Sequence, residues 1–395
     1  MLKKHPKGLL AAALANMGER FGFYTMMAIL VLFLQAKFGL SGPNAGLIYS
    51  IFYFSIYILA FVGGLIADKT RNYKGVILIG LVVMATGYFI LAYPTPTPSP
   101  HRTLLLILSC FGLFTIAFGN GLFKGNLQAL VGQMYDNAEY GKMRDSGFSI
   151  FYMFINVGAL FAPIVAVGTR NWWLEHNGFQ YNSNLPELCY AHLNGTITPE
   201  AHERFAALAQ EVSKTPVADL TTFANTYLNV FTTGFHYAFM FSIAAMLISL
   251  AIYLVNKRRF PNPAPRVKSA ATGRVEGDMD PAEVRQRLYA LFAVFAVVIF
   301  FWFSFHQNGL TLTYFAKDYT NLSGIAINLG IVTIKGLPFV HPSDRPWQLL
   351  PAWMATPRKR GSSPDKQRQQ YPYRLQSFWA WRVPFPWPST NQKLT

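Results

Sequence analysis

Charged residues and cysteine are scarce in this sequence. Only 13% of its 395 residues are charged, whereas a soluble domain carries about 25%. This shortage, together with a hydrophobic content of 52%, excludes an ordinary soluble domain and indicates a membrane protein. The two cysteines, Cys110 and Cys189, are too few for a disulfide framework and show no metal-ligand spacing. We therefore expect neither a bound metal nor a cofactor.

Acidic residues are also outnumbered, with 18 Asp and Glu against 34 Lys and Arg and a net charge of +16. A nucleic-acid-binding protein would gather such a charge on one face of a soluble domain. Here the basic residues fall in short segments between apolar runs and in the last part of the chain. We expect no nucleic-acid partner, and the absence of a nucleophile or metal motif argues against an enzyme.

Long apolar segments dominate the chain, and seven of them reach the roughly 20 residues that a helix needs to cross a bilayer. We predict an all-α membrane protein with a six-helix bundle over 1–255, a polar linker over 256–287 and a seventh helix over 288–316. The expected spans lie near 9–36, 44–67, 75–93, 103–133, 147–167, 229–255 and 288–316.

The charge of the connecting segments alternates along the chain. Basic residues precede the first span and follow the second, fourth and sixth, whereas the segments after the third and fifth spans carry few. By the positive-inside rule, the N-terminus and the linker 256–287 are cytoplasmic and 168–228 is an extracytoplasmic loop. We expect a multi-pass protein of the cell membrane, the inner membrane if the host is bacterial, with the lipid bilayer as a partner.

The last part of the chain, 317–395, has no segment that could span a bilayer. Its residues 330–395 hold ten prolines and five of the eight tryptophans. One interpretation is a disordered tail rich in proline and tryptophan. Our preferred hypothesis is a chain truncated or frameshifted after its seventh helix, with the reading frame lost near residue 329.

Two charged residues, Glu19 and Arg20, lie inside the first span. Each costs about 2.5–3.5 kcal/mol in a lipid-length helix unless it finds a partner, and such residues usually mark an ion or substrate path. Neighbours in a helix point about 100° apart, so we expect these two not to pair with each other. Because Glu19 is the one acidic residue in a span core, we predict an ion pair with Lys124 of the fourth span. In the alternative, Lys124 reaches the cytoplasmic surface.

Other polar residues in the spans leave two interpretations open. Tyr49, Tyr53 and Tyr57 form one stripe at helical spacing, either for aromatic packing or as hydroxyls that line a polar cavity. Asn156 in the fifth span serves either a contact between helices or a ligand. His306 in the seventh span titrates near neutrality, which favours a proton relay over a satisfied core histidine.

Glycines in the spans indicate close contact between helices. We expect such contact at Gly63–Gly64 and at Gly158, and either close contact or local unwinding around Gly119 and Gly121. The second span ends in a cluster of charges that we interpret as a conformational latch. Its members are Asp68, Lys69 and Arg71.

Four of these stretches together resemble the proton-dependent oligopeptide transporter (POT) family of the major facilitator superfamily, over about 9–328. They are Glu19-Arg20-Phe21-x-Phe23-Tyr24, Gly63-Gly64-x-x-Ala67-Asp68, Phe123-Lys124 and Phe151-Tyr152-x-x-Ile155-Asn156-x-Gly158-Ala159-Leu160. The resemblance implies that the six-helix bundle is the N-terminal half of that fold. The seventh helix would then open a second bundle, of which the rest is missing here.

For function, the resemblance implies symport of di- and tripeptides with protons by alternating access between two bundles. The alternative is a truncated, non-transporting fragment of such a transporter. By the same resemblance, Glu19, Arg20 and Lys124 couple proton and peptide. The residues expected at the peptide are Tyr24, Tyr57, Lys124, Asn156 and Trp302.

The sequence departs from the family pattern at three places. Asn16 stands where the first motif has another glutamate, and Met27 stands where a basic residue is usual. The glutamate of a Glu-Gln pair in the seventh helix is replaced, since the chain has His306 followed by Gln307. We predict that His306 carries the proton in place of that glutamate.

Overall fold

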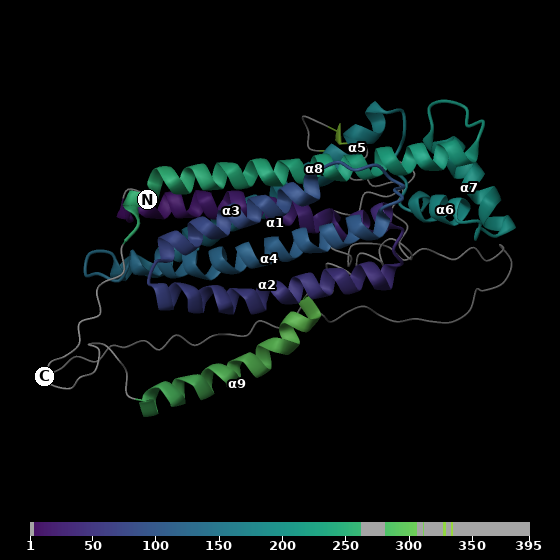
Figure 1. Ribbon diagram of the computed structural model, residues 1–395. Coiled ribbons are helices and arrows are strands. Elements are labelled where there is room, and N and C mark those ends of the chain that lie inside the picture. The colour runs from purple at the N-terminus through teal and green to yellow at the C-terminus, as the bar shows by residue number, and fades with distance from the viewer. Residues whose placement is uncertain (1–3, 262–280, 306–310, 312–326, 329–332, 335–395) are drawn as a thin grey trace, which may run out of the picture. The chain divides into compact units, whose positions relative to one another are not determined.

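The computed structural model describes residues 4–261, 281–305, 311, 327–328 and 333–334 (Figure 1). These residues are almost entirely helical, with one antiparallel pair of two-residue strands in which Ile327 pairs with Ile334. The elements are α1 (Lys7–Phe38), α2 (Gly42–Thr70), α3 (Tyr73–Ala92), α4 (Arg102–Gln133), η2 (Gly141–Met143), α5 (Arg144–His176), α6 (Leu185–Leu193), α7 (Pro199–Val212), α8 (Leu220–Asn256), η3 (Lys257–Arg259), α9 (Pro281–Phe305), β1 (Ile327–Asn328) and β2 (Thr333–Ile334).

Seven helices in this part of the chain are long and apolar enough to cross a membrane, which confirms the predicted fold class. They are α1, α2, α3, α4, α5, α8 and α9. The seventh helix is described up to Phe305. His306, Gln307 and, apart from β1 and β2, the tail 317–395 lie outside the described residues.

The segment 168–228, predicted as a loop, is largely helical. α5 runs past the predicted end at 167, α8 begins before the predicted start at 229, and α6 and α7 lie between them. α8 has a clear start signal, because the Asp219 carboxylate accepts hydrogen bonds from the backbone N–H groups of Thr221 and Thr222. Hydropathy alone missed these extensions because their residues are partly polar.

The helices of the bundle lie side by side along one direction (Figure 1). α1 packs against α5 and α8, α4 packs against α2 and α3, and α3 also packs against α8. α1, α3 and α5 end where α2, α4 and α8 begin, near α6 and α7, and we call this the α6–α7 end. The other end, where α1 begins and α8 finishes, is the opposite end.

Close backbone approach joins α1 to its two neighbours. The hydroxyl of Ser242 in α8 donates to the carbonyl of Gly22 at 2.9 Å. On the α5 side, a Cβ added to Gly158 would lie 2.8 Å from the carbonyl oxygen of Met17, so the predicted close contact at this glycine is confirmed. Lipid offers helices no hydrophobic drive to associate, so small residues and hydrogen bonds between helices carry this packing.

α2 and α4 cross at a pair of glycines. A Cβ added to Gly63 would overlap the backbone of Gly121, whereas one added to Gly64 would meet no atom within 4 Å. The Asn126 amide of α4 also donates to the Gly63 carbonyl at 3.0 Å. α4 is continuous through this region, so its glycines serve close contact and not local unwinding.

The two neighbouring glycines of α2 provide a matched test of this crossing. Gly63→Ala should lower the free energy of unfolding by about 1–3 kcal/mol, because the added methyl group overpacks the α2–α4 contact. Gly64→Ala should be neutral or stabilising, because alanine favours a helix and nothing obstructs it. Thermal unfolding in detergent, followed by circular dichroism, measures both. Equal effects of the two substitutions would contradict the assigned contact.

Candidate functional site

Glu19 and Arg20 of α1 form an ion pair inside the bundle. Glu19 is 0% exposed, and its two carboxylate oxygens accept hydrogen bonds from Arg20 Nε at 2.5 Å and Nη2 at 2.6 Å. The prediction that these neighbours do not pair is wrong. The angle of about 100° separates their Cα–Cβ directions, but the long arginine side chain bends back to reach the carboxylate.

Asn120 of α4 supplies the third hydrogen bond to this carboxylate. Its Nδ2 donates to Glu19 Oε1 at 2.8 Å, and Asn120 itself is fully buried. With the paired arginine and the amide, Glu19 has three hydrogen bonds in a place that water does not reach. Asn120 therefore joins α4 to the charged residues of α1.

The predicted ion pair between Glu19 and Lys124 is absent from the described residues. The Lys124 ammonium lies instead 5.3 Å from the centre of the Tyr57 ring of α2, a cation–π distance. The reason is that Arg20 and Asn120 already hold the carboxylate. Lys124 is half-buried, one helical turn after Asn120 on α4, and no ion pair in the described ranges includes it.

Two buried polar atoms beside the ion pair have no hydrogen-bond partner among the described residues. They are Asn120 Oδ1 and the hydroxyl of Tyr88 in α3, which lies close enough to interact electrostatically with Glu19 and Arg20. An unsatisfied buried group costs about 1–3 kcal/mol. Asn120 Oδ1 can therefore accept another hydrogen bond, and the Tyr88 hydroxyl can accept or donate one.

The tyrosine stripe of α2 shows the aromatic packing of the first interpretation, and the lining of a polar cavity by its hydroxyls stays a prediction. Tyr49 and Tyr53 are stacked with ring centres 5.9 Å apart, and Tyr53 and Tyr57 lie 5.7 Å apart. The rings therefore pack on one another, as in the structural interpretation. Tyr57 is nevertheless 50% exposed, and the Lys124 ammonium lies over its ring.

The remaining residues predicted at the peptide are only partly brought together. Tyr24 is half-buried on α1, next to Phe23, over which the Arg20 guanidinium lies at 5.0 Å. Asn156 is exposed on α5 and has no hydrogen-bond partner in the described part, which disfavours its use as a contact between helices. Trp302 contacts Phe301 and Phe305 of its own helix.

The charges predicted as a latch lie at the end of α2. Asp68, Lys69 and Arg71 are all exposed, and Arg71 ends the helix in a left-handed conformation with a φ of 52°. Asp68 accepts a hydrogen bond from the hydroxyl of Tyr73 at the start of α3. This bond joins the two helices across their short connection, and the latch stays a prediction.

Sequence reasoning missed the roles of two asparagines in α4. Asn120 holds Glu19, and Asn126 donates to the carbonyls of Gly63 and Leu122. A signal was present, because an amide in an apolar span needs a partner, and Asn120 precedes Lys124 by one turn. The predicted contact of the fourth span rested on its charged residue, Lys124, and therefore omitted both asparagines.

Arg170 falls in the segment 168–228 that was predicted as a loop, but it belongs to the extended α5 and is completely buried. Its guanidinium lies 3.7 Å from the ring centre of Tyr181 and donates to Asn171 Oδ1 at 3.0 and 2.8 Å. This contact anchors the segment after α5 to the bundle. The sequence did not indicate this burial, because Arg170 lies just beyond the apolar run of the predicted fifth span.

A family model described as the POT family matches residues 74–276, just over half of the chain, from α3 to beyond α8.

No group of three or more His, Cys, Asp or Glu in the described ranges could hold a metal ion.

Curated proteins similar to the chain include permeases. "Dipeptide and tripeptide permease A" of Cronobacter turicensis is 34% identical over 182 residues, which cover 46% of this chain and 34% of the permease. The protein of the same name from Escherichia coli K12 is 32% identical over 161 residues, 41% of this chain and 30% of that protein. "Uncharacterized transporter YclF" of Bacillus subtilis is 34% identical over 186 residues, 46% and 34% of the two chains. The chain thus spans about a third of the length of the curated relatives it matches.

The solved structures that are similar to this chain include two POT transporters. The crystal structure of peptide transporter POT in complex with sulfate is 26% identical, with a TM-score of 0.43, and the match covers 76% of this chain and 46% of that one. A POT family transporter in complex with 5-aminolevulinic acid is 19% identical, with a TM-score of 0.49 and coverage of 85% and 66%.

The buried ion pair can be tested by removing one charge and then both. Glu19→Gln leaves the Arg20 guanidinium buried without a charged partner, which should cost about 3–5 kcal/mol of stability. Adding Arg20→Met removes the unpaired buried guanidinium, so the double variant should unfold at a higher temperature than Glu19→Gln alone. Thermal unfolding in detergent measures the difference. A double variant less stable than Glu19→Gln would show that Arg20 has another partner.

Proposed function

Because this chain belongs to the POT family, we propose that it takes part in the symport of di- and tripeptides with protons. It is a multi-pass membrane protein with seven helices of spanning length in its described part. Several of its relatives bear the name dipeptide and tripeptide permease, which supports small peptides as the substrate class.

The observation that carries this proposal is a half-buried ammonium without a carboxylate. Lys124 has no ion pair in the described ranges and lies over the Tyr57 ring, one turn from the residue that holds Glu19. A cation in a membrane helix is costly without a partner. The C-terminal carboxylate of a bound peptide would supply the missing charge through a charge-assisted hydrogen bond.

The surroundings of Lys124 suit a short peptide of variable sequence. Tyr57 offers an exposed aromatic ring and a hydroxyl, and Asn156 offers an exposed amide that can bind a peptide backbone. Tyr24 lies half-buried on α1, near the buried ion pair. Aromatic rings and single polar groups recognise the backbone and the termini, so they tolerate different side chains.

The buried pair offers a route for proton coupling. Protonation of Glu19 would remove the charge that holds Arg20, leaving a free guanidinium beside the peptide site. The unpartnered atoms of Asn120 and Tyr88 could accept or pass on hydrogen bonds during this exchange. We propose His306, which lies outside the described residues, as a second proton carrier because imidazole titrates near neutral pH. Transport of this kind uses the proton gradient and needs no cofactor or catalytic residue.

The distribution of basic residues supports a cytoplasmic N-terminus. Lys4, Lys7, Lys142 and Lys257 all belong to connections at the opposite end of the bundle, where α1 begins and α8 finishes. By the positive-inside rule this end faces the cytoplasm. The α6–α7 end then faces away from it, and in a bacterium the membrane is the inner one.

Peptide binding tests the role of Lys124 directly. The full chain in detergent should bind dialanine about tenfold more tightly than dialanine amide, because only the free carboxylate pairs with the ammonium. Lys124→Gln should abolish this preference and leave binding of the amide unchanged. Isothermal titration calorimetry measures both affinities, with Lys142→Gln, an exposed lysine at the opposite end, as the control. An unchanged preference in Lys124→Gln would refute the assignment.

Uptake into proteoliposomes tests proton coupling. An imposed gradient, acidic on the uptake side, should drive accumulation of labelled dialanine by the full chain. Glu19→Gln and His306→Gln should each lose the dependence on the gradient, because each removes a proton carrier. Gradient-driven uptake that survives His306→Gln would exclude that residue as a carrier. Peptide binding without uptake in the unmodified chain would favour the alternative of a non-transporting fragment.

A further inference from the structure

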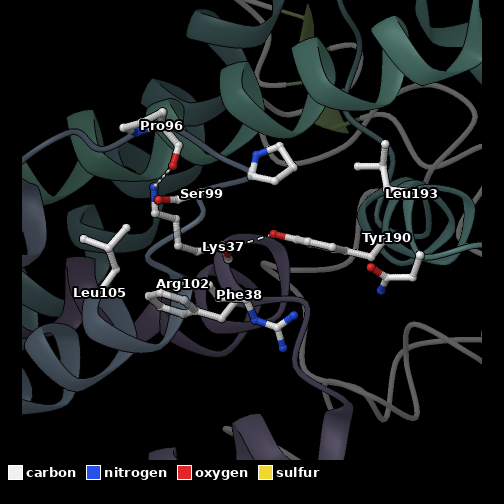
Figure 2. A pocket seen from close by; sticks show the side chains of 10 residues that line it. Lys37, Phe38, Pro96, Ser99, Arg102, Leu105, Tyr190 and Leu193 are labelled. Atoms are coloured by element: carbon white, nitrogen blue, oxygen red, sulfur yellow. Dashed lines mark hydrogen bonds between the residues drawn. The ribbon is translucent and has the colours of Figure 1, made fainter.

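Two adjoining cavities lie at the α6–α7 end, far from the ion pair of α1. Their volumes are about 180 and 170 Å³, and Lys37, Phe38 and Leu105 line both of them. Lys37 stands five helical turns after Glu19, about 27 Å along α1 at 1.5 Å per residue. Figure 2 shows the larger cavity, with Lys37 from α1, Arg102 from α4 and Tyr190 from α6 around it. No acidic residue lines either cavity.

The positive charge of Lys37 is held by neutral groups only. Lys37 is 5% exposed, and its ammonium donates to the carbonyl of Thr95 at 2.5 Å and to Thr97 Oγ1 at 2.7 Å. These bonds satisfy its hydrogens but do not neutralise its charge. Arg102, at the rim of the larger cavity, likewise has no ion pair among the described residues.

The start of α4 adds further positive potential. The first turn of this 32-residue helix holds no acidic residue, and the residue before it, His101, forms no capping hydrogen bond with its side chain. The N-terminus of a helix carries a partial positive charge, so Arg102 stands at the end where a cation is least favourable. Lys37, Arg102 and the helix terminus together produce a positive potential that would stabilise a bound anion.

Neutral polar side chains complete the larger cavity. The Tyr190 hydroxyl donates to the backbone carbonyl of Lys37 at 2.8 Å, which fixes its ring against the end of α1. Burial raises the pKa of this hydroxyl above its ordinary range, while the nearby Arg102 charge opposes the rise. Ser99 and Asn194 add a hydroxyl and an amide to the same wall. The Ser99 hydroxyl and the Asn194 amide suit an oxyanion with several acceptor oxygens, whereas the hydrogen of Tyr190 is already donated to Lys37.

The smaller cavity is lined by several apolar and aromatic side chains at the end of α3 and the start of α4. Phe89, Tyr93 and Leu108 line it, and the first two are 60% and 62% exposed. Aromatic residues at the end of a membrane span usually lie at the level of the lipid head groups. An oxyanion bound by Arg102 would therefore have room for an attached acyl chain beside it.

We propose that these two cavities bind an anionic phospholipid from the leaflet at the α6–α7 end. Its phosphate lies against Arg102 and the start of α4, in the field of Lys37, and its acyl chain follows Phe89 and Leu108. The proposal depends on the chain spanning a membrane and not on peptide transport. Loss of lipid binding and loss of peptide binding are therefore separate results.

Native mass spectrometry of the full chain, released from detergent micelles, tests the proposal. The chain should retain dioleoylphosphatidylglycerol about tenfold more than dioleoylglycerol, which has the same acyl chains but lacks the anionic phosphoglycerol head group. Arg102→Gln should abolish this preference. Arg102 is exposed, so the substitution should leave the fold intact. Arg204→Gln, an exposed arginine of α7 that lines neither cavity, is the matched control and should behave like the unmodified chain.

Three results would overturn the proposal. Equal retention of the two lipids would show that the phosphate is not recognised. A preference that survives Arg102→Gln would place the lipid elsewhere. Stabilisation against thermal unfolding by sodium phosphate alone, lost in Arg102→Gln and equal to that given by the phospholipid, would identify a site for a free oxyanion instead of a lipid.

Discussion

The carboxylate of Glu19 is closed off from water, and this single constraint organises the centre of the bundle. A buried carboxylate is stable only with a positive partner and enough hydrogen bonds, and lipid provides neither. Arg20 supplies the charge from the same helix, and Asn120 supplies an amide from α4. α1 must therefore lie deep inside, between α5 and α8, with α4 close enough for an asparagine to reach it.

The contacts of α4 show how small residues and polar residues depend on one another. Gly121 brings its backbone against α2, and this closeness lets the Asn126 amide reach the Gly63 carbonyl. The same helix presents Asn120 to α1 and Lys124 to Tyr57. A larger residue at the crossing would push α2 away and lengthen these polar contacts. Packing at the glycines and the placement of Lys124 beside Tyr57 therefore both depend on the close approach of α4 to α2.

Much of the fold could be predicted from the sequence, because seven long apolar segments leave few alternatives to a membrane bundle. The site was predicted less well. The pairing of Glu19 with Lys124 was inferred from the scarcity of acidic residues, and that argument ignored amides and the reach of a neighbouring arginine. α7 was missed because its stability depends on tertiary packing, as in the burial of Phe205, which hydropathy does not register.

Lys37 has a mechanical consequence for the whole of α1. Its ammonium is bound to the connection between α3 and α4, and its carbonyl is bound to Tyr190 of α6. α1 is one uninterrupted helix from Lys7 to Phe38, so a displacement at Glu19 is transmitted along a stiff rod to these attachments. Any rocking of α1 must carry the start of α4 and α6 with it or break three hydrogen bonds. The buried ion pair of α1 and the hydrogen bonds of Lys37 at the α6–α7 end are thus mechanically connected through this helix.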